Sequence, residues 1–146
     1  MDAILLLHAA ATLFLCGLIW TIQTVHYPLF ASVGRGSFAA YEQQHQSRVS
    51  WIVAPMMILE LGTGIVLLAG ASGSGPRFQF ALGFALIAII WVSTGLQAVP
   101  RHRELSLGFD ARAHRGLLRA NWNRTIAWSA RALLVLWVLG ANGGMR

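Results

Sequence analysis

Charged residues are scarce in this sequence, and lysine is missing from it altogether. Only 11% of the 146 residues are charged and 56% are hydrophobic, whereas an ordinary soluble domain has about 25% charged residues. The composition therefore excludes a domain that is surrounded by water on all sides. All eleven basic residues are arginines. Because they flank apolar stretches, the net charge of +6 does not indicate a nucleic-acid partner.

Cysteine is nearly absent as well. Cys16 is the single cysteine of the sequence, which excludes an intrachain disulfide and a metal cluster held by thiolates. The ligand motifs His-x-x-x-His and Cys-x-x-Cys do not occur. Histidine is the commonest transition-metal ligand and a frequent haem ligand, so the five histidines are the first candidates for such a role.

Four long apolar stretches account for most of the chain. They cover residues 3–24, 50–69, 78–98 and 121–139, and each is close to the roughly 20 residues that a membrane-spanning helix needs. The sequence therefore predicts an all-α protein, an integral membrane four-helix bundle that forms a single transmembrane domain over residues 1–146. Its main partner is the lipid bilayer.

The arginines are distributed unevenly over the connections between these stretches. Arg35 and Arg48 flank the first connection, and six arginines within residues 101–124 flank the third. The second connection has only Arg77. Since arginine-rich connections stay in the cytoplasm, we expect both termini on the outer side. The predicted location is the bacterial cytoplasmic (inner) membrane.

Ionisable residues inside the apolar stretches form the first candidate site. His8, Glu60 and Arg131 lie there, and a charge among lipid tails costs several kcal/mol unless it has a partner or a task. Counting helical turns places Glu60 and Arg131 near mid-membrane and His8 several turns further out. Two interpretations stay open: Glu60 and Arg131 simply pair, or they are catalytic, with Arg131 binding a carboxylate or propionate and Glu60 relaying protons.

The fourth stretch adds two candidates for cofactor binding. Asn121 and Trp128 lie on one helical arc with Arg131, and together with His8 they form the predicted cofactor-binding set. Tryptophans in such positions are mostly packing residues or membrane-interface residues, but they also line slots for flat cofactors.

Glu42 and His45 form the second candidate site, near the cytoplasmic end. Their Glu-x-x-His spacing places a carboxylate and an imidazole on one helix face. Di-iron bundles use two such elements, whereas this chain has one, so the alternative is a solvated start of the helix. With His26 or His102 as a third ligand, the site would suit non-haem iron, copper or zinc.

The order of these features resembles the haem-dependent, four-helix bacterial membrane protoporphyrinogen IX oxidases and the small four-helix membrane proteins related to them. The matching residues are His8, Gly17-Leu18, His26-Tyr27 in reversed order, Arg48-Val49, Ile52, Pro55, Met57, Asn121 and Thr125. The third helix of that family begins with a lysine, which this chain does not have. The resemblance implies that His8 is an axial ligand of haem b.

Three functions follow as hypotheses. The first is a haem b membrane oxidoreductase that acts on a small or porphyrin-like substrate and passes electrons to quinone. The second is a membrane protein with a non-haem metal bound by histidines and a carboxylate. The third is a small non-catalytic subunit of a larger membrane complex, whose polar intramembrane residues hold helices together. A homo-oligomer is compatible with all three.

Overall fold

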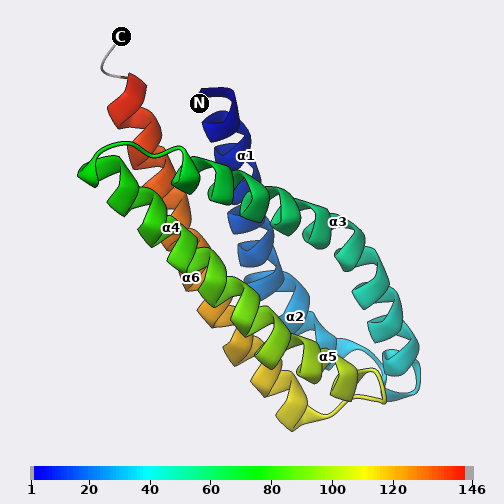
Figure 1. Ribbon diagram of the computed structural model, residues 1–146. Coiled ribbons are helices and arrows are strands. Elements are labelled where there is room, and N and C mark those ends of the chain that lie inside the picture. Colours follow the sequence, from blue (N-terminus) through cyan, green and yellow to red (C-terminus); the bar gives the residue numbers. More distant parts are fainter. Residues whose placement is uncertain (1, 144–146) are drawn as a thin grey trace.

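The computed structural model describes residues 2–143 as helices joined by short connections (Figure 1). No strand occurs within residues 2–143. In chain order the elements are α1 (Asp2–Thr21), η1 (Ile22–His26), α2 (Tyr27–Leu29), η2 (Phe30–Ser32), α3 (Arg35–Ala69), α4 (Ser74–Ser93), η3 (Thr94–Ala98), α5 (Val99–Leu105) and α6 (Ala111–Gly143). The predicted all-α class and four-helix arrangement are confirmed.

Four continuous helical segments are long and apolar enough to cross a membrane. They cover Ala3–Ser32, Arg35–Ala69, Ser74–Leu105 and Ala111–Ala141. We therefore describe a multi-pass membrane protein whose helices contact lipid. Each segment is longer than the apolar stretch that predicted it, because the helix continues into neighbouring polar residues.

Pro28 and Pro100 stand inside the first and third helical segments without ending them. Pro28 lies at the start of α2 and Pro100 at the start of α5, and a π-helical turn, η1 or η3, directly precedes each of these helices. Proline lacks an N–H group, and its ring clashes with the carbonyl one turn earlier. The wider π turn accommodates both defects, so each helix continues. Such turns are frequent at functional sites.

The four segments form an antiparallel ring. α1 packs against α3 and α6, and α4 packs against the same two helices. Both termini lie at one end of the bundle, together with the α3–α4 connection (Figure 1). α3 bends along its length (Figure 1), and Pro55 lies within it. Such a bend is expected at this place, because an internal proline removes one backbone hydrogen bond of the helix.

Gly64 allows three helices to meet closely. A Cβ atom at this position of α3 would lie 2.9 Å from Cδ1 of Ile87 on α4 and 3.4 Å from Cε1 of His8 on α1. Small residues permit such close approach between membrane helices. The absence of a side chain here therefore helps to bring His8 against α3.

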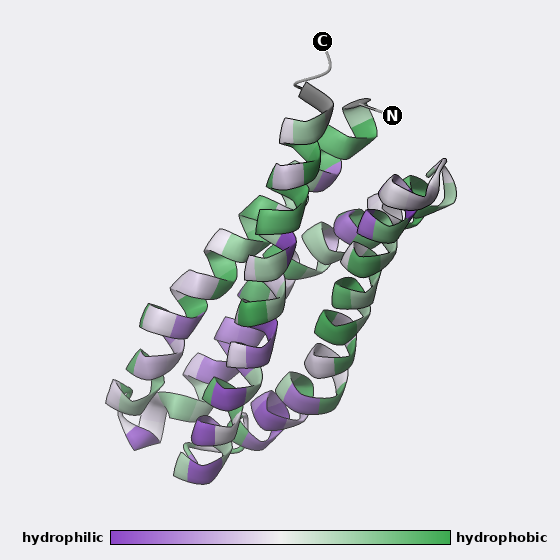
Figure 2. Ribbon diagram, turned by 90° about the vertical axis from the view of Figure 1, so that its left-hand side faces the viewer, coloured by the Kyte–Doolittle hydropathy of each residue, from purple (hydrophilic) through white to green (hydrophobic). Residues whose placement is uncertain are grey.

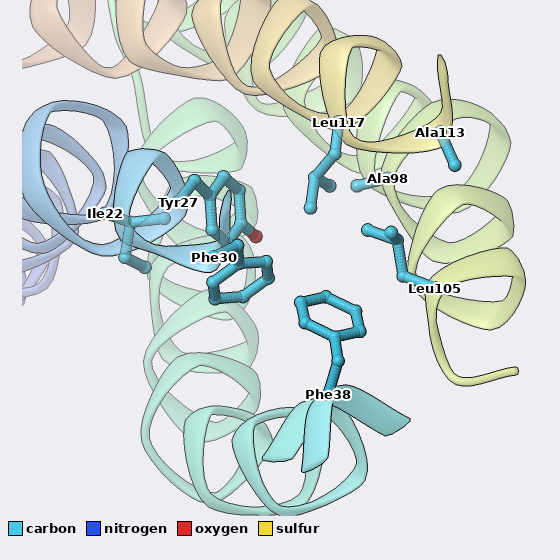
Figure 3. Close-up of a cluster of buried hydrophobic side chains, with 8 residues drawn as sticks. All are labelled: Ile22, Tyr27, Phe30, Phe38, Ala98, Leu105, Ala113 and Leu117. Carbon is cyan, nitrogen blue, oxygen red and sulfur yellow. The ribbon is translucent and has the colours of Figure 1, made fainter. Parts of the chain in front are cut away.

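Buried apolar side chains form three clusters along the bundle. The cluster at the end opposite the termini is rich in aromatic rings, and Tyr27, Phe30 and Phe38 lie side by side in it (Figure 3). The other two are centred on Trp128 and on Leu67. Figure 2 shows that most hydrophilic residues gather toward the end with the aromatic cluster. The polar groups described next reach from that end into the middle of the bundle.

Candidate functional site: a cavity beside two buried polar networks

A buried polar network, which we call the central network, joins α1, α3 and α6. Its members are His8, Thr12, Glu60, Thr63, Trp128 and Arg131. Oε1 of Glu60 accepts hydrogen bonds from Nε of Arg131 at 2.9 Å and from the Thr12 hydroxyl at 2.8 Å. Oε2 of Glu60 accepts one from Nε1 of Trp128 at 3.0 Å. Both carboxylate oxygens therefore have protein partners.

Arg131 extends this network to α4 and makes further contacts with α1. Its Nη1 donates to the backbone carbonyl of Gly83 on α4. Its Nη2 donates to Nε2 of His8 at 3.0 Å and lies 3.3 Å from the Thr12 hydroxyl. The side chains of Arg131 and Glu60 are only 2% and 1% exposed. The network therefore links all four membrane segments through hydrogen bonds that lipid cannot replace.

Both ring nitrogens of His8 are occupied. Nδ1 lies 2.7 Å from the hydroxyl oxygen of Thr63, and that hydroxyl donates to the carbonyl of Leu59 at 2.7 Å. Nδ1 of His8 must therefore carry the proton and donate it to Thr63. Nε2 accepts from Arg131, because a guanidinium group can only donate. This arrangement leaves His8 no lone pair for iron.

The space beside His8 is also small. A cavity of about 30 Å³ adjoins His8 and Arg131, which is the liquid volume of roughly one water molecule. The residues around His8 therefore do not fit a haem b group. The expectation that His8 lies several turns further out than Arg131 is wrong, since the two side chains touch. The predicted depth of His8 was wrong because a count of helical turns leaves out helix tilt and the helical turns beyond each apolar stretch.

A larger cavity lies nearer the aromatic end of the bundle. Its volume is about 260 Å³, close to the lower limit of small-molecule sites at roughly 300 Å³. Its walls are mainly apolar and come from all four membrane segments: Leu15, Leu18, Ile19, Ile22, Val49, Val53, Ala54, Met57, Trp91, Ala98, Val99 and Trp128. The π turns η1 and η3 each contribute to this lining.

The cavity faces the lipid between α3 and the third membrane segment. Its exposed lining residues are Ser50 and Ala54 on α3, Trp91 on α4 and Val99 on α5. The lining residues on α1 and α6 are less exposed. A molecule dissolved in the bilayer can therefore enter from the side.

Polar groups line the end of the cavity nearest the aromatic cluster, and two of them, Tyr27 and His102, form a chain with Glu42, which is not part of the lining. The Tyr27 hydroxyl lies 2.8 Å from Nε2 of His102, and Nδ1 of His102 lies 2.5 Å from Oε1 of Glu42. Glu42 is 0% exposed. A hydroxyl, an imidazole and a carboxylate in this order can pass a proton along the chain, with the carboxylate orienting the ring. We call these three residues the relay.

Gln46 fixes the relay in place. Its side-chain nitrogen lies 3.2 Å from Oε1 of Glu42, 3.2 Å from the His102 carbonyl and 2.6 Å from the Ser106 hydroxyl. Nε2 of His114 donates to the Tyr27 carbonyl at 2.7 Å. These contacts connect α3, α5 and α6 around the relay.

Arg124 also lines the cavity. Its Nη2 donates to Oδ1 of Asn121 at 2.6 Å, and Nδ2 of Asn121 donates to Oε1 of Gln23 at 2.8 Å. Nε of Arg124 is buried without a hydrogen-bond partner. Asn121 is 0% exposed and fixes the position of this arginine through the hydrogen bond. Trp128 belongs both to the cavity wall and to the central network.

The two candidate metal histidines on α3 and η1 bind each other. Nε2 of His26 lies 2.8 Å from Nδ1 of His45, whereas His102 and Glu42 form the separate pair described above. Within residues 2–143, no group of three His, Cys, Asp or Glu side chains is arranged to hold a metal ion. The predicted gathering of these four residues at one end is observed, but as hydrogen-bonded pairs.

The residue pattern predicted no role in a site for Tyr27, Gln46, Thr12 or Thr63. The threonines fall on the same helical faces as His8 and Glu60, so a search for polar partners one turn away would have found them. The sequence predicts a helix end at Tyr27, because a residue directly before a proline, here Pro28, disfavours helical geometry. The π turn η1, which no residue pattern indicated, keeps Tyr27 inside the bundle instead.

Comparisons with protein-family models, with curated proteins and with solved structures found no match. The resemblance to the membrane protoporphyrinogen IX oxidases stays a prediction.

Proposed function

We propose that the protein binds a lipid-soluble quinone in the 260 Å³ cavity and exchanges protons with it through the relay, as part of membrane redox chemistry. One observation carries the proposal: an apolar cavity faces the lipid and has a hydroxyl–imidazole–carboxylate chain at its polar end. A quinone has a flat ring, an apolar tail and carbonyl oxygens that need hydrogen-bond donors. Each of these parts has a counterpart in the cavity.

The walls suit a flat ring and a tail. Trp91 and Trp128 offer aromatic surfaces, and Met57 offers a flexible thioether that packs well against rings. The side opening between α3 and α5 leaves room for a tail to extend into the bilayer. The arrangement is typical of small-molecule sites, in which apolar walls surround a few placed polar groups.

The relay supplies protons when the quinone oxygen becomes basic. Electrons come from a separate redox partner, and the reduced oxygen then takes the hydroxyl proton of Tyr27. A protonated His102 returns a proton from Nε2 to Tyr27, and the Glu42 carboxylate stabilises the imidazolium before this step. His102 is reloaded from water at the arginine-rich end, which we assign to the cytoplasm by the positive-inside rule.

Haem b and a resident metal are not part of this proposal. The nitrogens of His8 are both hydrogen-bonded, and His26, His45, Glu42 and His102 form pairs. The proposal keeps the oxidoreductase class and the quinone from the haem hypothesis. It also accommodates the subunit hypothesis, because the electron donor is a separate protein or cofactor.

A cavity-blocking variant tests the proposal. Purified protein in lipid nanodiscs is titrated with decylubiquinone, and saturable quenching of tryptophan fluorescence gives Kd. Val53→Phe fills the cavity and should raise Kd by about tenfold or more, a change of roughly 1.4 kcal/mol. Ile58→Phe adds the same ring on a lipid-facing position of the same helix, 62% exposed, and should leave Kd unchanged. Equal Kd values for the Val53→Phe and Ile58→Phe variants would refute the proposal.

A further inference from the structure

Arg124 differs from the other buried arginine of the bundle in having no acidic partner. Arg131 has Glu60 at 2.9 Å. Arg124 is 7% exposed, yet among residues 2–143 no carboxylate lies within ion-pair distance of its guanidinium group. Its guanidinium group donates to the neutral amide of Asn121 and also interacts with the Tyr27 hydroxyl.

An uncompensated charge at this position is costly. Removing a charge from water costs several kcal/mol, and an interior position needs an opposite charge to offset that cost. Glu42 does not form an ion pair with Arg124: its Oε1 is bonded to His102 and Gln46, and its Oε2 is buried without a hydrogen-bond partner. Among residues 2–143, the positive charge of Arg124 at the cavity therefore has no carboxylate in direct contact with it.

The guanidinium group is also held ready for a ligand. Asn121 bonds to it and is itself held by Gln23, the Tyr27 hydroxyl lies beside it, and Arg124 is one of the residues that line the cavity. Nε is buried with no acceptor. An arginine fixed in this way, with an unused donor, is suited to bind an anionic oxygen.

We infer that the cavity takes its ligand as an anion, with a negatively charged oxygen against Arg124 and an apolar body against Trp91 and Trp128. This inference rests on the proposed function and specifies the ligand class. Suitable headgroups are the enolate of an acidic hydroxyquinone and the carboxylate of a fatty acid. A neutral quinone should bind more weakly than its acidic counterpart.

A matched pair of probes tests the inference. An alkylated hydroxynaphthoquinone is a vinylogous acid that is ionised at neutral pH, and its methyl ether has nearly the same shape without the charge. We expect wild-type protein in nanodiscs of neutral lipid to bind the anion at least about tenfold more tightly than the ether. Oleate, added as a competitor, reports whether a fatty-acid carboxylate occupies the same site.

Three variants separate charge from structure. Arg124→Gln should abolish the preference for the anion, and Arg124→Lys should retain most of it because the charge remains. Arg119→Gln removes an exposed arginine of the same helix and should have no effect. Thermal unfolding in detergent confirms that each variant is folded.

The outcomes distinguish this inference from the function on which it rests. If wild type binds the ether as tightly as the anion, or if Arg124→Gln keeps the preference, the inference fails and quinone binding stands. If neither naphthoquinone binds while oleate does, in an Arg124-dependent way, the inference holds for a carboxylate and the quinone proposal fails. If no probe binds, both fail.

Discussion

Arg131 and Glu60 form an ion pair at 2.9 Å, with side chains 2% and 1% exposed, between helices that are far apart in the sequence. The pair lies in the middle of the central network, and lipid offers neither partner a substitute. Breaking a buried pair from one side leaves an unpaired buried charge, which costs about 3–5 kcal/mol.

We therefore expect Glu60→Gln to destabilise the protein by roughly 3–5 kcal/mol, measured by reversible unfolding in mixed micelles. The matched control is Glu104→Gln, which breaks the half-exposed pair of Glu104 with Arg101, also at 2.9 Å. Exposed pairs contribute at most about 1 kcal/mol. Similar losses in the two variants would mean that the central network does not stabilise the bundle.

Gly64 should tolerate a side chain less well than Gly62. Both are on α3, but a Cβ at Gly64 would meet Ile87 at 2.9 Å, whereas one at Gly62 would have nothing within 4 Å. Changes in helix propensity cancel between Gly64→Val and Gly62→Val, so the difference reports packing. We expect Gly64→Val to be less stable by about 1–3 kcal/mol. Equal unfolding midpoints would show that α4 can move away freely.

Removing the Tyr27 hydroxyl should slow proton transfer while leaving binding largely intact. With decylubiquinone bound, dithionite supplies electrons, and stopped-flow absorbance follows formation of the quinol. Loss of a general acid usually costs about a hundredfold or more in rate, so Tyr27→Phe should be much slower than wild type. Tyr41→Phe, at the other tyrosine of the chain, should react like wild type. An unchanged rate in Tyr27→Phe would remove the relay from the mechanism.

His8 should not determine any haem spectrum of the protein. Its two nitrogens bond to Thr63 and Arg131, so haem added to purified wild type and to His8→Ala should give the same Soret absorption. A Soret band that appears in wild type and is lost in His8→Ala would restore the haem hypothesis. It would also require the central network to rearrange around the cofactor.

The sequence predicted the fold class well because lipid imposes a simple rule. A backbone in hydrocarbon must satisfy its own hydrogen bonds, so each apolar stretch of about 20 residues becomes a helix. The pairing of Glu60 with Arg131 was one of two interpretations left open, and their contact was foreseeable from the cost of lone charges. The sequence did not predict the position of His8, which depends on helix tilt. It also did not predict that the helices continue through Pro28 and Pro100, which depends on π turns.

By itself the sequence determined that this protein crosses a membrane four times and that its ionisable residues in the apolar stretches need partners. Only the tertiary structure decided which partners they have. In the folded chain Arg131 bonds to Glu60 and His8, and His102 bonds to Glu42. Arg124 lines the cavity without a carboxylate as partner in the described part of the chain. The reason is physical: composition sets the cost of burying a charge, but helix tilt and rotation decide which side chains come within 3 Å of each other.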